Sequence, residues 1–111
     1  MTATGNDLFG NKQGIIVEDS SGVPITLTGN RIHDNTNSGI FLTNSDGVEI
    51  RSSRTVHASA GTGIHLDSRS DNNRIEGNTA LGNHFDLADE GGTGNCWTNN
   101  TYETSTGDVS C

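Results

Sequence analysis

The sequence is poor in the residues from which an ordinary globular core is built. Hydrophobic residues make up 29% of its 111 residues and aromatic residues 5%, with a single Pro and two Cys. It has no run of 18 apolar residues, which argues against a transmembrane helix. Basic residues are also scarce, because 6 Lys and Arg stand against 14 Asp and Glu, for a net charge of −8. Nucleic acids and anionic membranes both need a basic surface, so neither is expected as a partner.

What the sequence has instead is a short internal repeat. An apolar residue, two spacers, Asn, one spacer and an apolar residue recur, most clearly as Leu27-x-x-Asn30-x-Ile32 and Ile75-x-x-Asn78-x-Ala80. The copies begin at positions 3, 27, 50, 75 and 97, and are therefore 24, 23, 25 and 22 residues apart. Self-similarity at this period is typical of a solenoid. A solenoid needs only a thin inward-facing column in each coil, which is compatible with the low hydrophobic content.

Each repeat also holds a four-residue piece with apolar residues at alternate positions, the period of a strand. Its copies are Gly14-Ile15-Ile16-Val17, Gly39-Ile40-Phe41-Leu42, Gly63-Ile64-His65-Leu66 and, without the Gly, His84-Phe85-Asp86-Leu87. A second alternation precedes each Asn, and a third strand begins at Ile32. The counterparts of Ile32 are expected to be Leu8, Val56, Ala80 and Tyr102, with an extra residue around Arg54-Thr55-Val56 interpreted as a bulge. Three short strands per repeat predict an all-β, parallel β-helix of about five coils, with residues 1–111 as one domain.

The recurring Asn residues are expected to stack in ladders at two corners of this β-helix. Stacked amide side chains can bond one another and the backbone of the turn, where a regular strand ladder is interrupted. The first column is Asn6, Asn30, Ser53, Asn78 and Asn100. The second column is Asn11, Asn35, Ser59 or Ala58, Asn83 and Ser105. A structural role is therefore expected for these residues.

The two ends of the expected β-helix differ. Residues 103–111 are expected to cap the C-terminal end, and Cys96 and Cys111 flank the last repeat, where a disulfide would hold the chain end. Closing this short loop would contribute roughly 2–3 kcal/mol and would indicate an oxidising compartment; the alternative is two unrelated thiols. No cap precedes the first repeat. We therefore expect that the chain is the C-terminal part of a longer solenoid, or that it associates with itself through the first coil.

Two segments resemble a known family. Asn30-Arg31-Ile32-His33-Asp34-Asn35 followed by Ser38-Gly39-Ile40-Phe41-Leu42 is similar to the right-handed parallel β-helix repeat. Pectate-lyase-like proteins, mannuronan epimerases, periplasmic sugar-binding and hydrolase-associated domains and phage tailspikes share that repeat. Gly94-Asn95-Cys96-Trp97-Thr98-Asn99-Asn100-Thr101 with Cys111 resembles the closing coil of secreted bacterial members. The resemblance implies right-handed winding, an extracellular or periplasmic location and an association with polysaccharides.

The catalytic motifs of that family do not occur in this sequence. An Asp-Pro-His-Glu-like epimerase motif, the paired-Asp and Gly-His-Gly elements of polygalacturonases, and the calcium-binding Asp cluster of pectate lyases are all missing. Enzymatic activity of the chain alone is therefore uncertain, and a non-catalytic, carbohydrate-associated structural segment is favoured. One alternative is a fragment of a polysaccharide lyase or epimerase whose catalytic coils lie elsewhere. Another is a self-assembling solenoid module.

A glycan-binding face is predicted on the outward side chains of the Gly-Ile-x-Leu strands. Ile16, Phe41, His65 and Asp86 are expected to form one outward column, with Asp67 and Glu18 at the neighbouring corner. Phe41 could stack on a sugar ring, and His65 could form hydrogen bonds or transfer a proton. The alternative interpretation is ordinary packing between side chains of neighbouring strands.

Metal ions are considered at two places, although no cofactor is the main expectation. His33 and His57 would lie one coil apart if the bulge precedes Val56, and with Asp34 they could hold zinc or copper. The site would still lack the third or fourth ligand that such metals usually need. Acidic corners at Glu18-Asp19, Asp67, Asp71 and Asp89-Glu90 could bind Ca²⁺, although solvated acids are the simpler interpretation.

Overall fold

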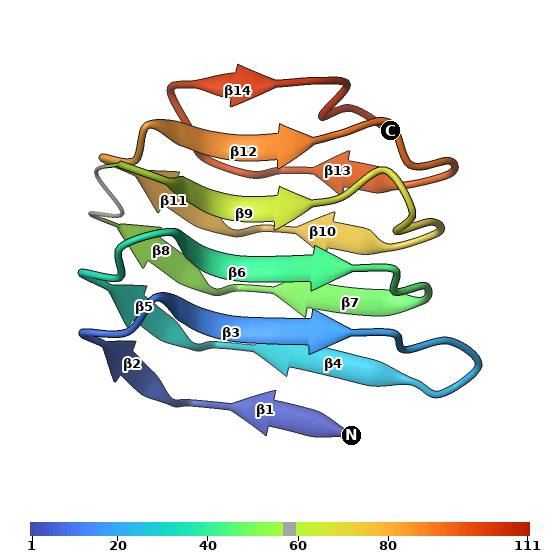
Figure 1. Cartoon of the computed structure of the whole chain (residues 1–111), viewed down its shortest axis with the longest axis horizontal. Coiled ribbons are helices and arrows are strands. Elements are labelled where there is room, and N and C mark those ends of the chain that lie inside the picture. The colour runs from blue at the N-terminus through green and yellow to red at the C-terminus, as the bar shows by residue number, and fades with distance from the viewer. Residues whose placement is uncertain (57–59) are drawn as a thin grey trace.

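The computed structural model describes residues 1–56 and 60–111, and within them every regular element is a β-strand. None of the described residues forms a helix that is long and apolar enough to cross a membrane. The strands form three parallel sheets (Figure 1). Sheet A contains β1 (Thr2–Thr4), β4 (Ile25–Thr28), β7 (Val48–Arg51), β10 (Arg74–Glu76) and β13 (Cys96–Thr98). Sheet B contains β2 (Asp7–Phe9), β5 (Arg31–His33), β8 (Arg54–Val56) and β11 (Thr79–Leu81). Sheet C contains β3 (Gln13–Glu18), β6 (Ser38–Thr43), β9 (Thr62–Leu66), β12 (Phe85–Asp89) and β14 (Ser105–Thr106).

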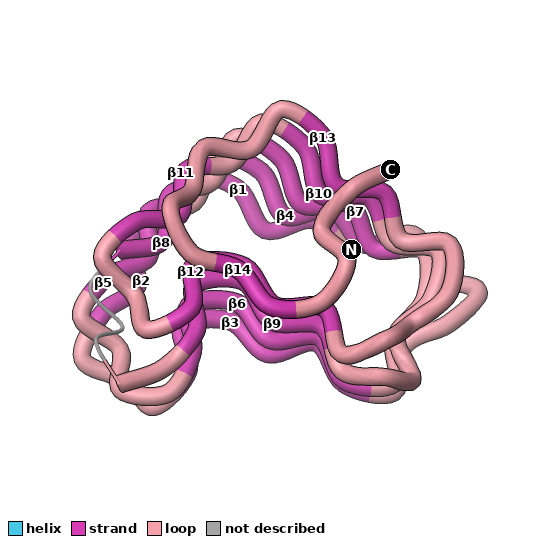
Figure 2. The backbone as a smooth tube through the Cα atoms, turned by 90° about the horizontal axis from the view of Figure 1, so that it is seen from above, coloured by secondary structure: helices cyan, strands magenta, loops and turns pink. Residues whose placement is uncertain are grey.

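Successive strands visit the three sheets in turn, so each set of three makes one coil. The first coil is β1–β3, the second β4–β6, the third β7–β9 and the fourth β10–β12, and β13 and β14 belong to an incomplete fifth. The chain winds right-handed as it rises from the N-terminus (Figures 1 and 2), the hand that parallel crossovers strongly favour. The predicted all-β parallel β-helix with three strands per coil is confirmed.

The core is a set of columns in which equivalent side chains lie one coil apart. The column of sheet A is Ala3, Leu27, Ile50, Ile75 and Trp97. One column of sheet C is Ile15, Ile40, Ile64 and Leu87. In the middle coils these side chains are fully buried. Burying one Leu or Ile contributes about 1.5–3 kcal/mol, so the thin core is stabilising although it holds few residues.

The register of sheet B corrects the predicted position of the third coil. Ile32 pairs with Thr55, and Thr55 pairs with Ala80, whereas Val56 had been expected beside Ile32. The prediction of a bulge before Val56 is therefore wrong. The sequence pattern misled because Val56 is apolar and Thr55 is not, yet Thr55 takes the inward position and is fully buried. No hydrogen-bond partner of its hydroxyl is found among the described residues.

The Gly that opens the sheet C strands is required by close packing. A Cβ at Gly39 would lie 2.6 Å from the carbonyl oxygen of Gly63 and 2.9 Å from Cγ2 of Thr55, so this position faces inward with no room for a side chain. In the fourth coil, Leu87 pairs with Ile64, which places Asp86 one residue earlier at the equivalent of Gly63. The last full coil therefore has a carboxylate where the earlier coils have a Gly.

Asn and Ser side chains connect successive coils at the corner between sheets A and B. The amide N–H of Asn6 donates to Oδ1 of Asn30 at 3.1 Å, and that of Asn78 donates to Oδ1 of Asn100 at 3.0 Å. Ser53 takes the place of an Asn in this column. Its hydroxyl oxygen accepts the backbone N–H of Asn30 at 3.3 Å, as the side-chain oxygen of Asn does in other coils. At the next corner, the N–H of Asn11 donates to Oδ1 of Asn35 at 3.0 Å. These bonds satisfy backbone groups that the turns would otherwise leave without partners.

The chain end crosses over the last coil. Figure 2 shows the tail passing from β14 across the end of the β-helix toward β13. Val109 packs against the core, and the N–H of Trp97 donates to the carbonyl oxygen of Ser110 at 3.2 Å. Cys96 and Cys111 form the predicted disulfide.

Candidate functional sites

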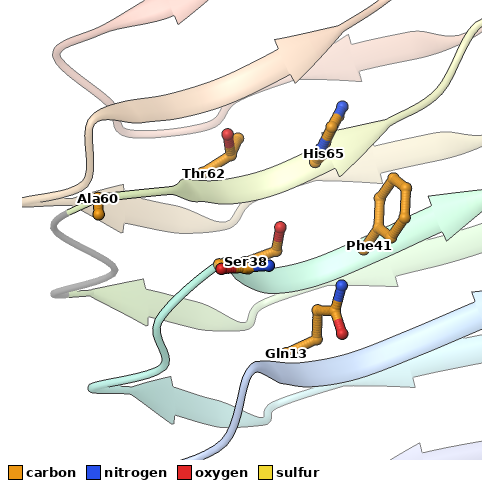
Figure 3. Close-up of a pocket in the computed structure, with 7 residues that line it drawn as sticks. Gln13, Ser38, Phe41, Ala60, Thr62 and His65 are labelled. Carbon is orange, nitrogen blue, oxygen red and sulfur yellow. The ribbon is translucent and has the colours of Figure 1, made fainter.

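Sheet C carries a shallow hollow on its outer face, across the first three coils. The hollow has a volume of about 330 Å³. Figure 3 shows the side chains of Gln13, Ser38 and Thr62 along one side and those of Phe41 and His65 along the other. The described residues that line it are Gln13, Asn37, Ser38, Phe41, Ala60, Thr62 and His65.

Register brings Phe41 and His65 together. Phe41 on β6 pairs directly with His65 on β9, and their rings lie 4.7 Å apart between centroids with planes tilted by 34°. Ile16 precedes them in the same column and is 48% exposed. His65 also contacts Glu90, with its Nε2 3.3 Å from a carboxylate oxygen of that residue. The result is an aromatic ring and an imidazole side by side at the edge of a polar hollow.

Asp86 does not belong to this column, and its predicted placement is wrong. Ala88, and not Asp86, pairs with His65. Asp86 is buried, and burial by itself raises the pKa of its carboxyl group. Hydrogen bonds from the backbone N–H groups of Glu103, Asn83 and Thr104, at 2.9, 3.1 and 3.1 Å, outweigh burial and hold the pKa below its usual value. Asp86 therefore organises the turn beneath the chain end.

Asp67 lies at the corner that follows β9, with its carboxylate occupied by local donors. Burial raises its pKa, but the Thr43 hydroxyl at 2.7 Å, the Asn44 N–H at 3.1 Å and the Ser70 hydroxyl at 2.9 Å together lower it to about 2. The carboxylate also accepts the backbone N–H of Arg69 at 3.1 Å. Asp67 thus ties the second coil to the third and does not line the hollow.

His33 lies on the outer face of sheet B, between two carboxylates. Its Nε2 is 2.9 Å from Oδ1 of Asp7, in the preceding coil, and its Nδ1 is 2.7 Å from Oδ2 of Asp34. The bond with Asp34 raises the pKa of His33 most; partial desolvation lowers it, and Asp7 raises it further. Phe9 stacks on the ring, with centroids 5.0 Å apart and planes at 17°. The pairing of His33 with Asp7 was not predicted, although the period places Asp7 two residues before Phe9, the partner of His33 in the register.

The predicted His33–His57 pair is not tested by the structure, since His57 lies outside the described residues. The register does place Val56 beside His33, which removes the bulge on which that pairing depended. Among residues 1–56 and 60–111, no group of three or more His, Cys, Asp or Glu side chains is arranged to hold a metal ion.

The acidic corners considered for Ca²⁺ use their oxygens within the protein. Asp71 accepts the N–H of Thr93 at 2.7 Å, and Asp19 accepts the side-chain amide of Asn44 at 2.9 Å. Asp89 is buried and accepts the indole N–H of Trp97 at 3.0 Å. It occupies the inward position equivalent to Leu66, a place where the sequence pattern predicts an apolar residue.

The polar side of the hollow was missed from the sequence. Gln13, Ser38 and Thr62 form a register column of their own. Each is followed by the Gly that faces inward, so the simple alternation of a strand is broken there. The signal that could have found this column is a polar residue directly before each of three equivalent Gly residues.

Comparison with known proteins places the chain in a family. No curated protein and no solved structure matches it at significant similarity. A family model described as "Periplasmic copper-binding protein (NosD)" matches residues 1–108. This family is periplasmic, which confirms the predicted extracellular or periplasmic location. The predicted pectate-lyase-like relationship is not specifically supported. The chain, a parallel β-helix matched over almost its whole length, therefore belongs to the NosD family of periplasmic copper-binding proteins.

Proposed function

We propose that this structural β-helix module binds a neutral glycan in the hollow on sheet C. The proposal rests on one observation, the aromatic ring of Phe41 against the imidazole of His65 at the edge of a hollow lined by amide and hydroxyl groups. The apolar C–H face of a sugar packs well on an aromatic ring. Its hydroxyl groups need nearby donors and acceptors, which Gln13, Ser38 and Thr62 supply.

The size and charge of the hollow support this ligand class. Its volume of about 330 Å³ lies at the lower end of the range for small-molecule sites, which suits one or two sugar rings bound weakly. The described residues of the lining include no Asp, Glu, Lys or Arg. A neutral glycan therefore fits the lining better than a charged uronate does.

Binding is favoured over cleavage because the described lining offers one titratable side chain and no carboxylate. Hydrolysis of glycosidic bonds generally needs two carboxyl groups in separate roles, and among the described residues that line this hollow His65 is the one titratable side chain. The carboxylates of Asp86 and Asp67, which were predicted nearby, instead accept structural hydrogen bonds from Glu103 and Thr43. A lyase or epimerase function would have to come from coils outside this sequence.

The test compares two outward-facing Phe residues, each of which contacts the ring of a His one coil away. Phe41→Ala removes the ring at the hollow, and Phe9→Ala removes the ring beside His33. On a glycan array followed by calorimetry, we expect binding to fall about fivefold in Phe41→Ala, since stacking is worth roughly 1 kcal/mol. Phe9→Ala should bind like the parent. Equal loss in both variants, or a parent that binds no glycan, would contradict the proposal.

Copper binding is a second candidate function, favoured by the family description and by the surroundings of His33. Imidazole and carboxylate groups are suitable ligands for Cu(II). Thiolate and thioether ligands, which select Cu(I), are scarce, because both Cys form the disulfide and Met1 is the single Met. The candidate is tested by equilibrium dialysis of the protein against Cu(II), which measures bound copper while free copper remains present. A retained amount well below one ion per chain would contradict it.

A further inference from the structure

The cluster around His33 is assembled by the coil geometry from residues far apart in the sequence. β5 ends at His33, and Asp34 follows in the left-handed backbone conformation, with φ of 55°, at the corner. Asp7 begins β2 in the coil below. Both carboxylates point at the same imidazole, one at each ring nitrogen. The side chains of Asp7 and Asp34 are 54% and 64% exposed, so solvent ions reach them.

This arrangement calls for a cation between His33 and Asp7. In a neutral imidazole one ring nitrogen carries a proton and the other a lone pair. If Nδ1 donates its proton to Asp34, the lone pair of Nε2 faces Oδ1 of Asp7 at 2.9 Å, and two acceptors repel. A second proton removes the repulsion, and so does a metal ion bound by both atoms.

The donor set fits a Cu(II) ion in that position. Two ligands of one such ion, each about 2 Å from it and at right angles, lie roughly 2.8 Å apart, which is close to the observed separation. Nitrogen and carboxylate oxygen are the donors of tetragonal Cu(II) sites. Asp34 supplies the carboxylate that typically accepts the other N–H of a metal-binding His and fixes its tautomer.

We propose that Nε2 of His33 and Oδ1 of Asp7 bind one Cu(II) ion, with Asp34 as the positioning residue. The inference rests on copper binding, the second candidate function, and assigns it to these residues. Among the described residues no group of three or more ligands is arranged to hold a metal ion, so this site would have two protein ligands and water would complete the coordination. Such an open site would exchange its ion readily.

The other described histidines provide internal comparisons. His65 contacts one carboxylate, Glu90, at 3.3 Å and packs against Phe41. His84 is exposed and contacts the edge of Phe85, with ring centroids 4.6 Å apart. Neither residue has carboxylates at both ring nitrogens among its described contacts, so neither matches the His33 arrangement.

The experiment is a calorimetric titration of the full chain with Cu(II), combined with electron paramagnetic resonance of the loaded protein. We expect one ion per chain and coupling to a single imidazole nitrogen. His33→Gln should abolish this signal, and Asp7→Asn should weaken binding. Asp34→Asn should weaken it by about 10–100-fold while the imidazole coupling persists, as expected for a residue that positions a ligand. His84→Gln is the matched control and should bind Cu(II) like the parent.

The outcomes distinguish failure of the proposed His33–Asp7 site from failure of copper binding by the chain as a whole. A His33→Gln variant that keeps full binding would overturn the site and leave copper binding standing. A parent chain that binds no Cu(II) would overturn both. Circular dichroism of each variant shows whether the β-helix is intact, and Asp34→Asn, a change of one exposed group, keeps the test decisive if His33→Gln fails to fold.

Discussion

The first and last coils differ in how well their inward side chains are buried. In the first coil, Ala3, Leu8 and Ile15 are only partly buried. In the last, Trp97 belongs to the same column as Ala3 and is 3% exposed. β1, β2 and β3 lie at the ends of their sheets, so each pairs on one side. The other end is covered by the chain itself, which crosses the last coil after β14 (Figure 2). The same repeat therefore ends in two different ways.

The covered end depends on residues that depart from the repeat. Asp89 takes an inward apolar position and accepts the indole N–H of Trp97. Asp86 takes the position of an inward Gly and accepts N–H groups from the returning chain. Gly107, with φ of 78°, passes where a Cβ would collide with the carbonyl oxygen of Asp89. A stacked coil is stabilised by its neighbours, so a coil with no neighbour needs other contacts, and here buried carboxylates and a disulfide provide them.

The largest expected effect is the loss of Trp97. Trp97→Ala should lower the free energy of unfolding by roughly 3–5 kcal/mol, because it leaves a cavity and removes a partner of the buried Asp89. Leu8→Ala at the open end should cost only about 1 kcal/mol, since Leu8 is partly exposed. Chemical denaturation of the two variants measures both values. Equal losses would show that the two ends are not energetically different.

The disulfide should contribute the next largest effect at the covered end. Replacing Cys96 and Cys111 with Ser opens a loop of 15 residues and should destabilise the protein by about 3 kcal/mol. Thermal unfolding of the double variant, beside the parent with and without reductant, checks this. Reduction of the parent should reproduce the variant, and a reduced parent as stable as the oxidised one would contradict the role of the disulfide.

Self-association through the first coil would sharpen the comparison at the open end. We expect the 111-residue chain, with a mass of 11.7 kDa, to double its apparent mass as concentration rises, because pairing of two first coils covers their strand edges. Leu8→Asp places a charge among the partly buried side chains and should keep the chain monomeric. Light scattering over a hundredfold concentration range measures this. A parent that stays monomeric throughout would contradict self-association.

Acid should weaken the second half of the β-helix, where Asp67 and Asp86 lie, and this is the smallest effect. Both pKa values are below that of an unfolded Asp, near 3.8, and that of Asp67 is about 2. The folded state therefore binds fewer protons than the unfolded state, and the stabilisation present above pH 4 is lost as the pH falls toward 2. Thermal unfolding between pH 5 and pH 2 measures the slope. Asp67→Asn should flatten it, and an unchanged slope would contradict this role of Asp67.

Much of the fold could be predicted because the repeat is encoded locally. The spacing of Leu27, Ile50 and Ile75 predicts one column, and these residues do stack. The cysteines at either side of the last repeat predict the disulfide. The register within sheet B and at the start of β12 could not be predicted, because coils of 22 to 25 residues differ at their corners. As a result Thr55 in β8 and Asp86 in β12 occupy inward positions that the sequence pattern did not assign to them.

The sequence by itself determined the solenoid, since a 22–25-residue period with alternating apolar residues allows each coil to bury only its inward column against the next. Only the tertiary structure decided which polar groups meet. It placed Asp7 and Asp34 on opposite sides of His33, put Asp86 at an inward position of β12 and not in the predicted outward column, and aligned Gln13 with Thr62 along the hollow. The physical reason is that contacts between coils join residues more than twenty positions apart, and a shift of one or two residues at a corner exchanges the side chains that face each other.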